Sequence, residues 1–106
     1  MKTYQIMIEY EGSKFVGWQM QKNGISVQEV IQKALRKLIK KKITIYGSGR
    51  TDAGVHAIEQ SAHFRTDYKI NSKISFIKSI NFFLSNYDVS ILAVKKKQNN
   101  FHARHS

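Results

Sequence analysis

The stretch SVQEVIQKALRKL, residues 26–38, decides the fold that we expect of this chain. Ser26 followed by Glu29 is the pattern of a capping box, in which each side chain satisfies a backbone N–H at the start of a helix. Apolar residues then recur at helical spacing: Val27, Val30, Ile31, Ala34, Leu35 and Leu38. The stretch therefore predicts an amphipathic helix, and the patterns on either side set its place in the fold.

Strand patterns flank this helix. Tyr4, Ile6, Ile8 and Tyr10 alternate with less apolar neighbours before it, and the β-branched run at residues 43–46 follows it. The first run predicts a strand with one buried face, and the second predicts a short strand.

The remaining patterns predict two more strands and a second helix. Residues 58–65 alternate between the set Ile58, Gln60, Ala62, Phe64 and a more polar set, and residues 89–94 are apolar except for Ser90. Between them, Asn71 or Ser72 can cap a helix. That helix carries Ile74, Ile77, Ile80, Phe83 and Leu84, of which we expect Ile77, Ile80 and Phe83 in the core.

The resulting order, β-α-β-β-α-β, predicts a ferredoxin-like α+β domain over residues 1–94. Two helices pack on one face of an antiparallel sheet, and residues 95–106 form a basic tail. The second face of the sheet must then meet water, RNA or another layer. We expect that face to expose apolar and aromatic groups.

Composition limits the function classes. The 106 residues contain no cysteine, which excludes disulfides and cysteine-based zinc sites and fits a cytoplasmic protein. No apolar run approaches the roughly 20 residues that span a bilayer, and the alternating N-terminus is not a signal peptide. The net charge of +11 favours nucleic acid as a partner. A lysine-rich composition without function is the alternative.

A glycine-rich stretch, GSGRTDAGVHA at residues 47–57, follows the short strand. It is neither a P-loop nor a Rossmann fingerprint, because it has no lysine and a strand pattern follows it. Asp52 has no second carboxylate nearby, so it acts alone as a nucleophile, a base or a salt-bridge partner. Arg50 favours the ionised form of that carboxylate, and a purely structural Arg–Asp pair remains open.

Four segments resemble the TruA-type tRNA pseudouridine synthases, in the family's order. Residues 49–57, GRTDAGVHA, resemble the family signature, and residues 10–21, YEGSKFVGWQMQ, resemble its first loop. Residues 26–29, SVQE, resemble the start of its first helix, and residues 101–104, FHAR, resemble the segment that leads into its central region.

This resemblance implies that uridine is isomerised to pseudouridine in the anticodon stem-loop of tRNA, at tRNA positions 38, 39 and 40. Asp52 would be the catalytic nucleophile, and Arg50 would position it and assist base flipping. The carboxylate can add to the base or the sugar, or take up a proton, and these routes stay open. The isomerisation involves no redox change, so we expect no metal and no cofactor.

The resemblance also implies RNA contacts, a homodimer and a longer protein. Candidate RNA-binding residues are Lys14, Gln19, Gln21, His56 and Arg104. Family members carry a second, similarly folded half, with the cleft between the halves, and a base-stacking tyrosine after the FHAR segment. We therefore expect this chain to be an N-terminal half that is inactive alone.

Two other function classes compete with the enzyme. A ferredoxin-like RNA-binding module stacks bases on aromatic residues of its central strands, whereas residues 61–65 offer Ser61, His63 and Arg65. A non-catalytic interaction domain would leave the Arg50–Asp52 stretch unexplained.

Overall fold

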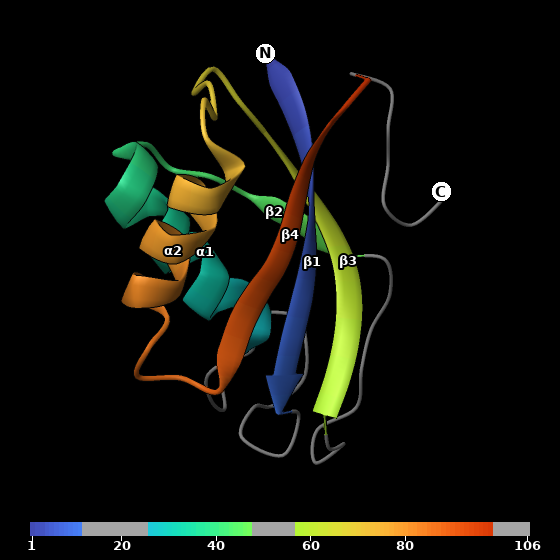
Figure 1. The fold of residues 1–106 in the computed structure, drawn as a ribbon, viewed down its shortest axis with the longest axis vertical. Coiled ribbons are helices and arrows are strands. Elements are labelled where there is room, and N and C mark those ends of the chain that lie inside the picture. Colours follow the sequence, from blue (N-terminus) through green and yellow to red (C-terminus); the bar gives the residue numbers. More distant parts are fainter. Residues whose placement is uncertain (12–25, 48–56, 99–106) are drawn as a thin grey trace.

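The computed structural model describes residues 1–11, 26–47 and 57–98. They form the expected six elements in the expected order (Figure 1). These are β1 (Lys2–Glu11), α1 (Val27–Ile39), β2 (Ile45–Gly47), β3 (Ala57–Thr66), α2 (Lys73–Phe83) and β4 (Val89–Lys97).

The four strands form one antiparallel sheet in the order β2-β3-β1-β4. β1 lies in the middle and pairs with β3 along its whole length, from Lys2 opposite Thr66 to Glu11 opposite Ala57. Both helices lie on one face of this sheet (Figure 1). The predicted ferredoxin-like α+β fold is confirmed.

The core fills the space between the helices and the sheet. Tyr4, Ile6, Ile8 and Tyr10 of β1 are all buried, as their alternation predicted. α1 begins as its sequence predicted, because the Ser26 hydroxyl accepts a hydrogen bond from the Glu29 N–H at 3.2 Å. Burial of each large aliphatic side chain stabilises the fold by roughly 1.5–3 kcal/mol.

α2 differs in detail from its prediction. Ser72 is the cap, and Ile80 and Leu84 are buried. Ile77 and Phe83 are partly buried against the core, but Ile74 is 70% exposed. Phe76, which the helical pattern did not single out, is buried in its place. The helix packs on the edge strand β4 and against α1, and the buried residues Phe76, Ile80 and Leu84 form one stripe along it.

β4 is longer than its apolar pattern suggested. It continues through the three lysines Lys95–Lys97, which pair with residues 3–5 of β1. A register shift lies opposite Met7/Ile8, so β4 contains a bulge, and Leu92 there is 46% exposed. Backbone pairing with β1 holds these three lysines in the strand, although a run of lysines is more typical of a solvent-exposed tail.

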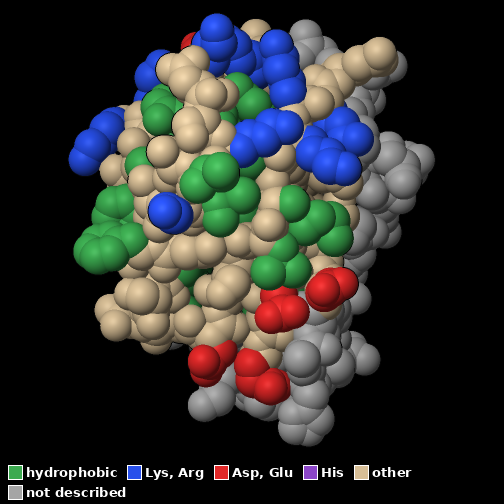
Figure 2. Space-filling model, in the orientation of Figure 1, with side chains coloured by type: hydrophobic (Ala, Val, Ile, Leu, Met, Phe, Trp, Pro, Cys, Tyr) green, Lys and Arg blue, Asp and Glu red, His purple; other side chains and the backbone are tan. Residues whose placement is uncertain are grey.

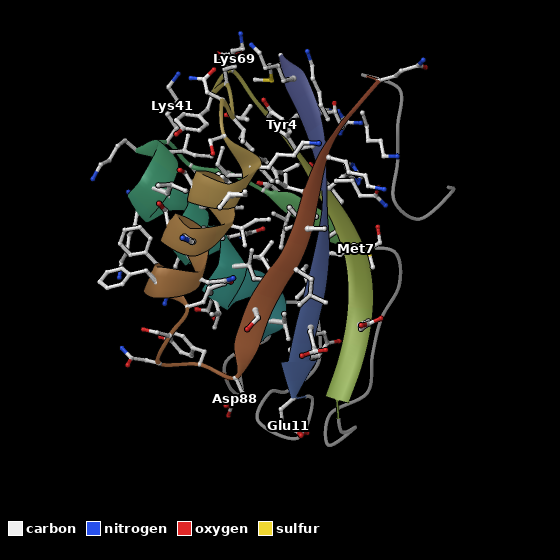
Figure 3. All side chains as sticks on the ribbon, viewed as in Figure 1. Tyr4, Met7, Glu11, Lys41, Lys69 and Asp88 are labelled. Atoms are coloured by element: carbon white, nitrogen blue, oxygen red, sulfur yellow. The ribbon has the colours of Figure 1, made fainter. Side chains whose placement is uncertain are left out.

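The second face of the sheet is polar rather than apolar. Figure 3 shows Met7 on this side, away from the helices. Its described neighbours in β1 and β3 are mostly hydrophilic: Thr3, Gln5, Glu9, Ser61, His63 and Arg65. The prediction of an apolar, aromatic face is therefore wrong for most described positions, because the polar residue of each alternating pair points here.

Candidate active site and its supporting strands

The glycine-rich stretch connects two neighbouring strands, β2 and β3. Gly47 ends β2 opposite Ala62, and Ala57 begins β3 opposite Glu11. Arg50, Asp52 and His56 fall between these anchors and lie outside the described residues. The two ends of the stretch are thus fixed to the sheet by backbone pairing, while the site residues themselves stay predictions.

The other predicted RNA contacts also lie outside the described residues. Lys14, Gln19 and Gln21 belong to the connection between β1 and α1, and Arg104 follows β4. The first of these connections leaves β1 at Glu11, which is the register partner of Ala57. The segment that contains Lys14, Gln19 and Gln21 therefore starts next to the point in the sheet where the glycine-rich stretch ends.

The short strand that leads into this stretch is held by α1. The Gln32 Oε1 accepts a hydrogen bond from the Ile45 N–H at 3.0 Å, and the Gln28 Nε2 donates to the Ile45 carbonyl at 3.1 Å. The same Gln28 Nε2 donates to the Gln32 Oε1 at 3.3 Å. Both backbone groups of Ile45 are therefore satisfied by two side chains that lie one turn apart on α1, which fixes β2 against α1.

The strand that follows the stretch is held by β1. The Tyr10 hydroxyl donates to the Gln60 Oε1 at 3.1 Å, and both residues are buried. On the opposite face, the Gln5 Nε2 donates to the Ser61 Oγ at 2.7 Å. A buried hydrogen bond is costly to break, because its partners are then left with neither each other nor water to bond to. Side chains on both faces therefore bond β3 to β1 within the first half of β3.

Tyr46, His63 and Arg65 form a cluster on the second face that the sequence did not predict. His63 is fully buried, although it lies on the face away from the helices. Its ring stacks on Tyr46 with centroids 5.1 Å apart, and its Nε2 lies 3.4 Å from the Arg65 Nη1. Tyr46 directly precedes the glycine-rich stretch. The pairing of Tyr46 with His63 across β2 and β3 creates this group, and no local sequence pattern announces it.

Charge is divided between the two ends of the sheet (Figure 2). Glu11 and its neighbour Asp88 mark the acidic end, where the Glu11 N–H donates to the Asp88 carbonyl at 3.0 Å (Figure 3). Lys41 and Lys69 lie at the opposite end. The anchors Glu11 and Ala57 belong to the acidic end, so the described surface beside them carries little of the positive charge.

Two further features were sought among the described residues. Within the described ranges, no three His, Asp or Glu side chains gather as a metal-binding group. In that same part of the chain, no helix is long and apolar enough to cross a membrane.

Comparison with known proteins decides the family. A family model described as tRNA pseudouridine synthase matches residues 6–105. The chain belongs to the tRNA pseudouridine synthase family. It is 54% identical over its whole length to a tRNA pseudouridine synthase A from Pelagibacter ubique and covers 43% of that relative.

Other relatives give the same result. A tRNA pseudouridine synthase A from Wigglesworthia glossinidia brevipalpis is 50% identical across the whole chain, which covers 39% of it. One from Thermoanaerobacter sp. is 40% identical, again across the whole chain, with 43% of the relative covered. The chain thus spans about two fifths of the length of these family members, all from their tRNA pseudouridine synthase A branch.

Proposed function

We propose that this chain is the N-terminal part of a tRNA uridine-to-pseudouridine isomerase that acts on the anticodon stem-loop, at tRNA positions 38, 39 and 40. The match of the family model over residues 6–105 carries this proposal. The relatives are named tRNA pseudouridine synthase A, and the tRNA positions rest on the resemblance of the four sequence segments. The glycine-rich stretch that begins at Gly47 lies within the matched range.

Asp52 is the proposed nucleophile. Isomerisation breaks the C–N glycosidic bond, turns the uracil and forms a C–C bond, and one ionised carboxylate can initiate this sequence. Arg50, two residues earlier in the sequence, is proposed to position this carboxylate and to favour its ionised form. The isomerisation involves neither redox change nor hydrolysis, so we expect no metal and no organic cofactor.

The backbone anchors support this assignment physically. A catalytic group must be held within a fraction of an ångström of its productive position. β2 is tied to α1 through Gln28 and Gln32, and β3 is tied to β1 through Tyr10 and Gln60. Rigid strands on both sides of residues 48–56 are what a positioned nucleophile requires.

The RNA is proposed to bind with its target base flipped out of the stack. Lys14, Gln19, Gln21, His56 and Arg104 are the proposed contacts. The protein is proposed to act in the cytoplasm as a homodimer whose second half completes the cleft. The coverage of about two fifths of each relative leaves room for such a half.

The alternative, a non-catalytic RNA-binding module, fits the sheet less well. Such modules stack bases on exposed aromatic side chains of the two central strands. Here the described central strands present Thr3, Gln5 and Met7 or Ser61 and Arg65 on the second face. In the described part of this face, the exposed aromatic ring is that of Tyr46, which belongs to the edge strand β2 and is already stacked on His63.

The test is Asp52→Asn in the protein at the full length of its relatives. The substitution keeps the shape of the side chain and removes its charge, so pseudouridine formation in tRNA should fall below roughly a few per cent of the unsubstituted level. Asp67→Asn is the matched control, because Asp67 is an exposed carboxylate beyond the far end of β3. Mass-tagged pseudouridine is measured together with tRNA affinity. Retained activity in Asp52→Asn would refute the nucleophile role.

A further inference from the structure

Four lysines from four separate segments converge on one shallow pocket. Lys2 opens β1, Lys69 lies between β3 and α2, Lys73 opens α2, and Lys96 lies in β4. We call this pocket the lysine basin. Its remaining lining is Tyr4, Ile70 and Val94. It lies at the basic end of the sheet, where Figure 3 labels Tyr4 and Lys69 and Figure 2 shows the basic side chains gathered.

The described residues give the positive charge of the basin no counter-charge. None of the described residues that line it is acidic. The salt bridges of the described chain involve other lysines, Lys33 with Glu29 and Lys41 with Asp67. Like charges gathered without counter-charges oppose the compact state. A bound anion would relieve that repulsion. Lysines spread evenly over the surface would not create it.

The floor of the basin is rigid and apolar. The Tyr4 hydroxyl accepts a hydrogen bond from the Ile70 N–H at 3.0 Å and donates to the Tyr68 carbonyl at 3.3 Å. This hydroxyl is therefore occupied, and Val94 is buried beside it. The polar side-chain groups that face a ligand are ammonium groups on long flexible stems, which suit an anion with several acceptor oxygens.

The size of the basin selects the ligand further. Its volume is about 80 Å³. That is room for a few waters or one compact anion, and it is far below the roughly 300–1,000 Å³ of pockets that enclose a drug-sized molecule. A single tetrahedral phosphate fits this description, whereas a nucleobase or an organic cofactor does not.

The lysines of β4 indicate where the phosphate comes from. Lys96 pairs with Tyr4 and lies on the basin side, whereas Lys95 pairs with Gln5 and belongs to the second face. The Lys95–Lys97 run therefore presents positive charge on both sides of the edge strand. A free phosphate ion can occupy one side only, but the backbone of an extended polyanion can follow the run around the edge.

We propose that the lysine basin binds a backbone phosphate of RNA, as a contact remote from the glycine-rich stretch. The ten residues of β1 separate the basin from the Glu11–Ala57 anchors. At about 3.3 Å per residue, that separation is about 30 Å. That the phosphate belongs to RNA rests on the proposed function. The basin supplies attraction at the opposite end of the sheet from the acidic anchors and so orients the RNA along β1.

The test compares two triple variants of this 106-residue chain. Lys69→Gln/Lys73→Gln/Lys96→Gln removes three charges from the basin. Lys33→Gln/Lys37→Gln/Lys78→Gln removes three charges from exposed helix positions outside it. All six residues are exposed, so both variants should stay folded, which circular dichroism verifies. Affinity for a synthetic RNA hairpin is measured by fluorescence anisotropy over a series of salt concentrations.

We expect the basin variant to bind the hairpin about tenfold more weakly at 0.15 M salt, the effect of losing one charge-assisted phosphate contact. Its slope of log affinity against log salt should fall by about one. The control should lose less than about threefold, because distant charges are screened at this salt. Equal affinities of the two variants, or no hairpin binding by the unsubstituted chain, would overturn the proposal.

A second measurement separates RNA from free phosphate. Inorganic phosphate is titrated into the chain while backbone amide NMR signals of the basin residues are followed. If phosphate shifts these signals but the basin variant keeps its RNA affinity, the basin holds free phosphate and the RNA proposal is wrong. Because binding is read without catalysis, this result is independent of Asp52→Asn. Failure of the basin and failure of the proposed function can therefore be told apart.

Discussion

The side chain of Gln32 bonds the backbone of Ile45, with 3.0 Å between the Gln32 Oε1 and the Ile45 nitrogen. Asn81 does the same for Ile91 on the other side of the molecule, through an accepted bond of 2.7 Å and a donated bond of 3.0 Å. Each helix thus clamps one edge strand of the sheet, α1 holding β2 and α2 holding β4. These clamps satisfy edge groups that would otherwise be open to pairing with another chain.

Gln32→Leu should lower the free energy of unfolding by about 1–3 kcal/mol, because the Ile45 N–H is left without its acceptor in a part-buried site. Urea denaturation of the chain measures this change. Lys33→Leu is the control, since the neighbouring side chain is exposed and its ion pair with Glu29 is worth little. A loss no larger than that of the control would show that the clamp is not stabilising.

Asn81→Leu should destabilise the chain by a similar amount, because both backbone groups of Ile91 lose their partner beside the bulge of β4. Amide hydrogen exchange should also become faster for Ile91 than for residues of β3. Lys78→Leu on the same helix is the matched control. Unchanged exchange at Ile91 in the Asn81 variant would contradict the expectation.

The stacked pair of Tyr46 and His63 should show a favourable coupling of about 0.5–1.5 kcal/mol in a double-mutant cycle to alanine. His63→Ala should be the more damaging single change, because His63 is fully buried whereas Tyr46 is 46% exposed. Thermal or urea unfolding of the four proteins supplies the cycle. Additive effects of the two substitutions would mean that the rings stack without stabilising each other.

RNA affinity of the chain should fall steeply as salt rises, because a net charge of +11 implies release of counterions from neutralised phosphates. The slope of log affinity against log salt should correspond to several ions. Binding of an RNA hairpin over a salt series is the measurement. A flat dependence would identify the lysine excess as composition alone.

The chain alone should be folded and catalytically inactive, because the second half and its stacking tyrosine are expected elsewhere in the protein. Single-turnover assays with the chain in excess over tRNA measure this, and any pseudouridine formed would refute it. We also expect self-association, detected by light scattering. The exposed apolar side chains Ile74 and Phe82 of α2, rather than the polar second face, are the surface we expect to drive it. Phe82→Lys should then restore a monomer, and a chain already monomeric would refute this expectation.

The sequence by itself determined the order of elements and most of the core. Alternation along residues 4–10 and helical spacing along residues 27–38 are local signals, because each depends only on which side chains must share one face. The glycine-rich stretch could be recognised for the same reason, since its residue types follow one another in the chain. Its placement between the ends of two strands also followed from the patterns on either side.

The tertiary structure alone decided how the edge strands are held and where charge gathers. The clamps of Gln32 on Ile45 and Asn81 on Ile91 join segments whose relation is fixed only by packing. The lysine basin draws Lys2 and Lys96 together from opposite ends of the chain, because β1 and β4 pair. Likewise, the sequence predicted that Lys95–Lys97 belong to a tail, but the structure places them in β4. Backbone pairing with β1 outweighs the low strand propensity of lysine.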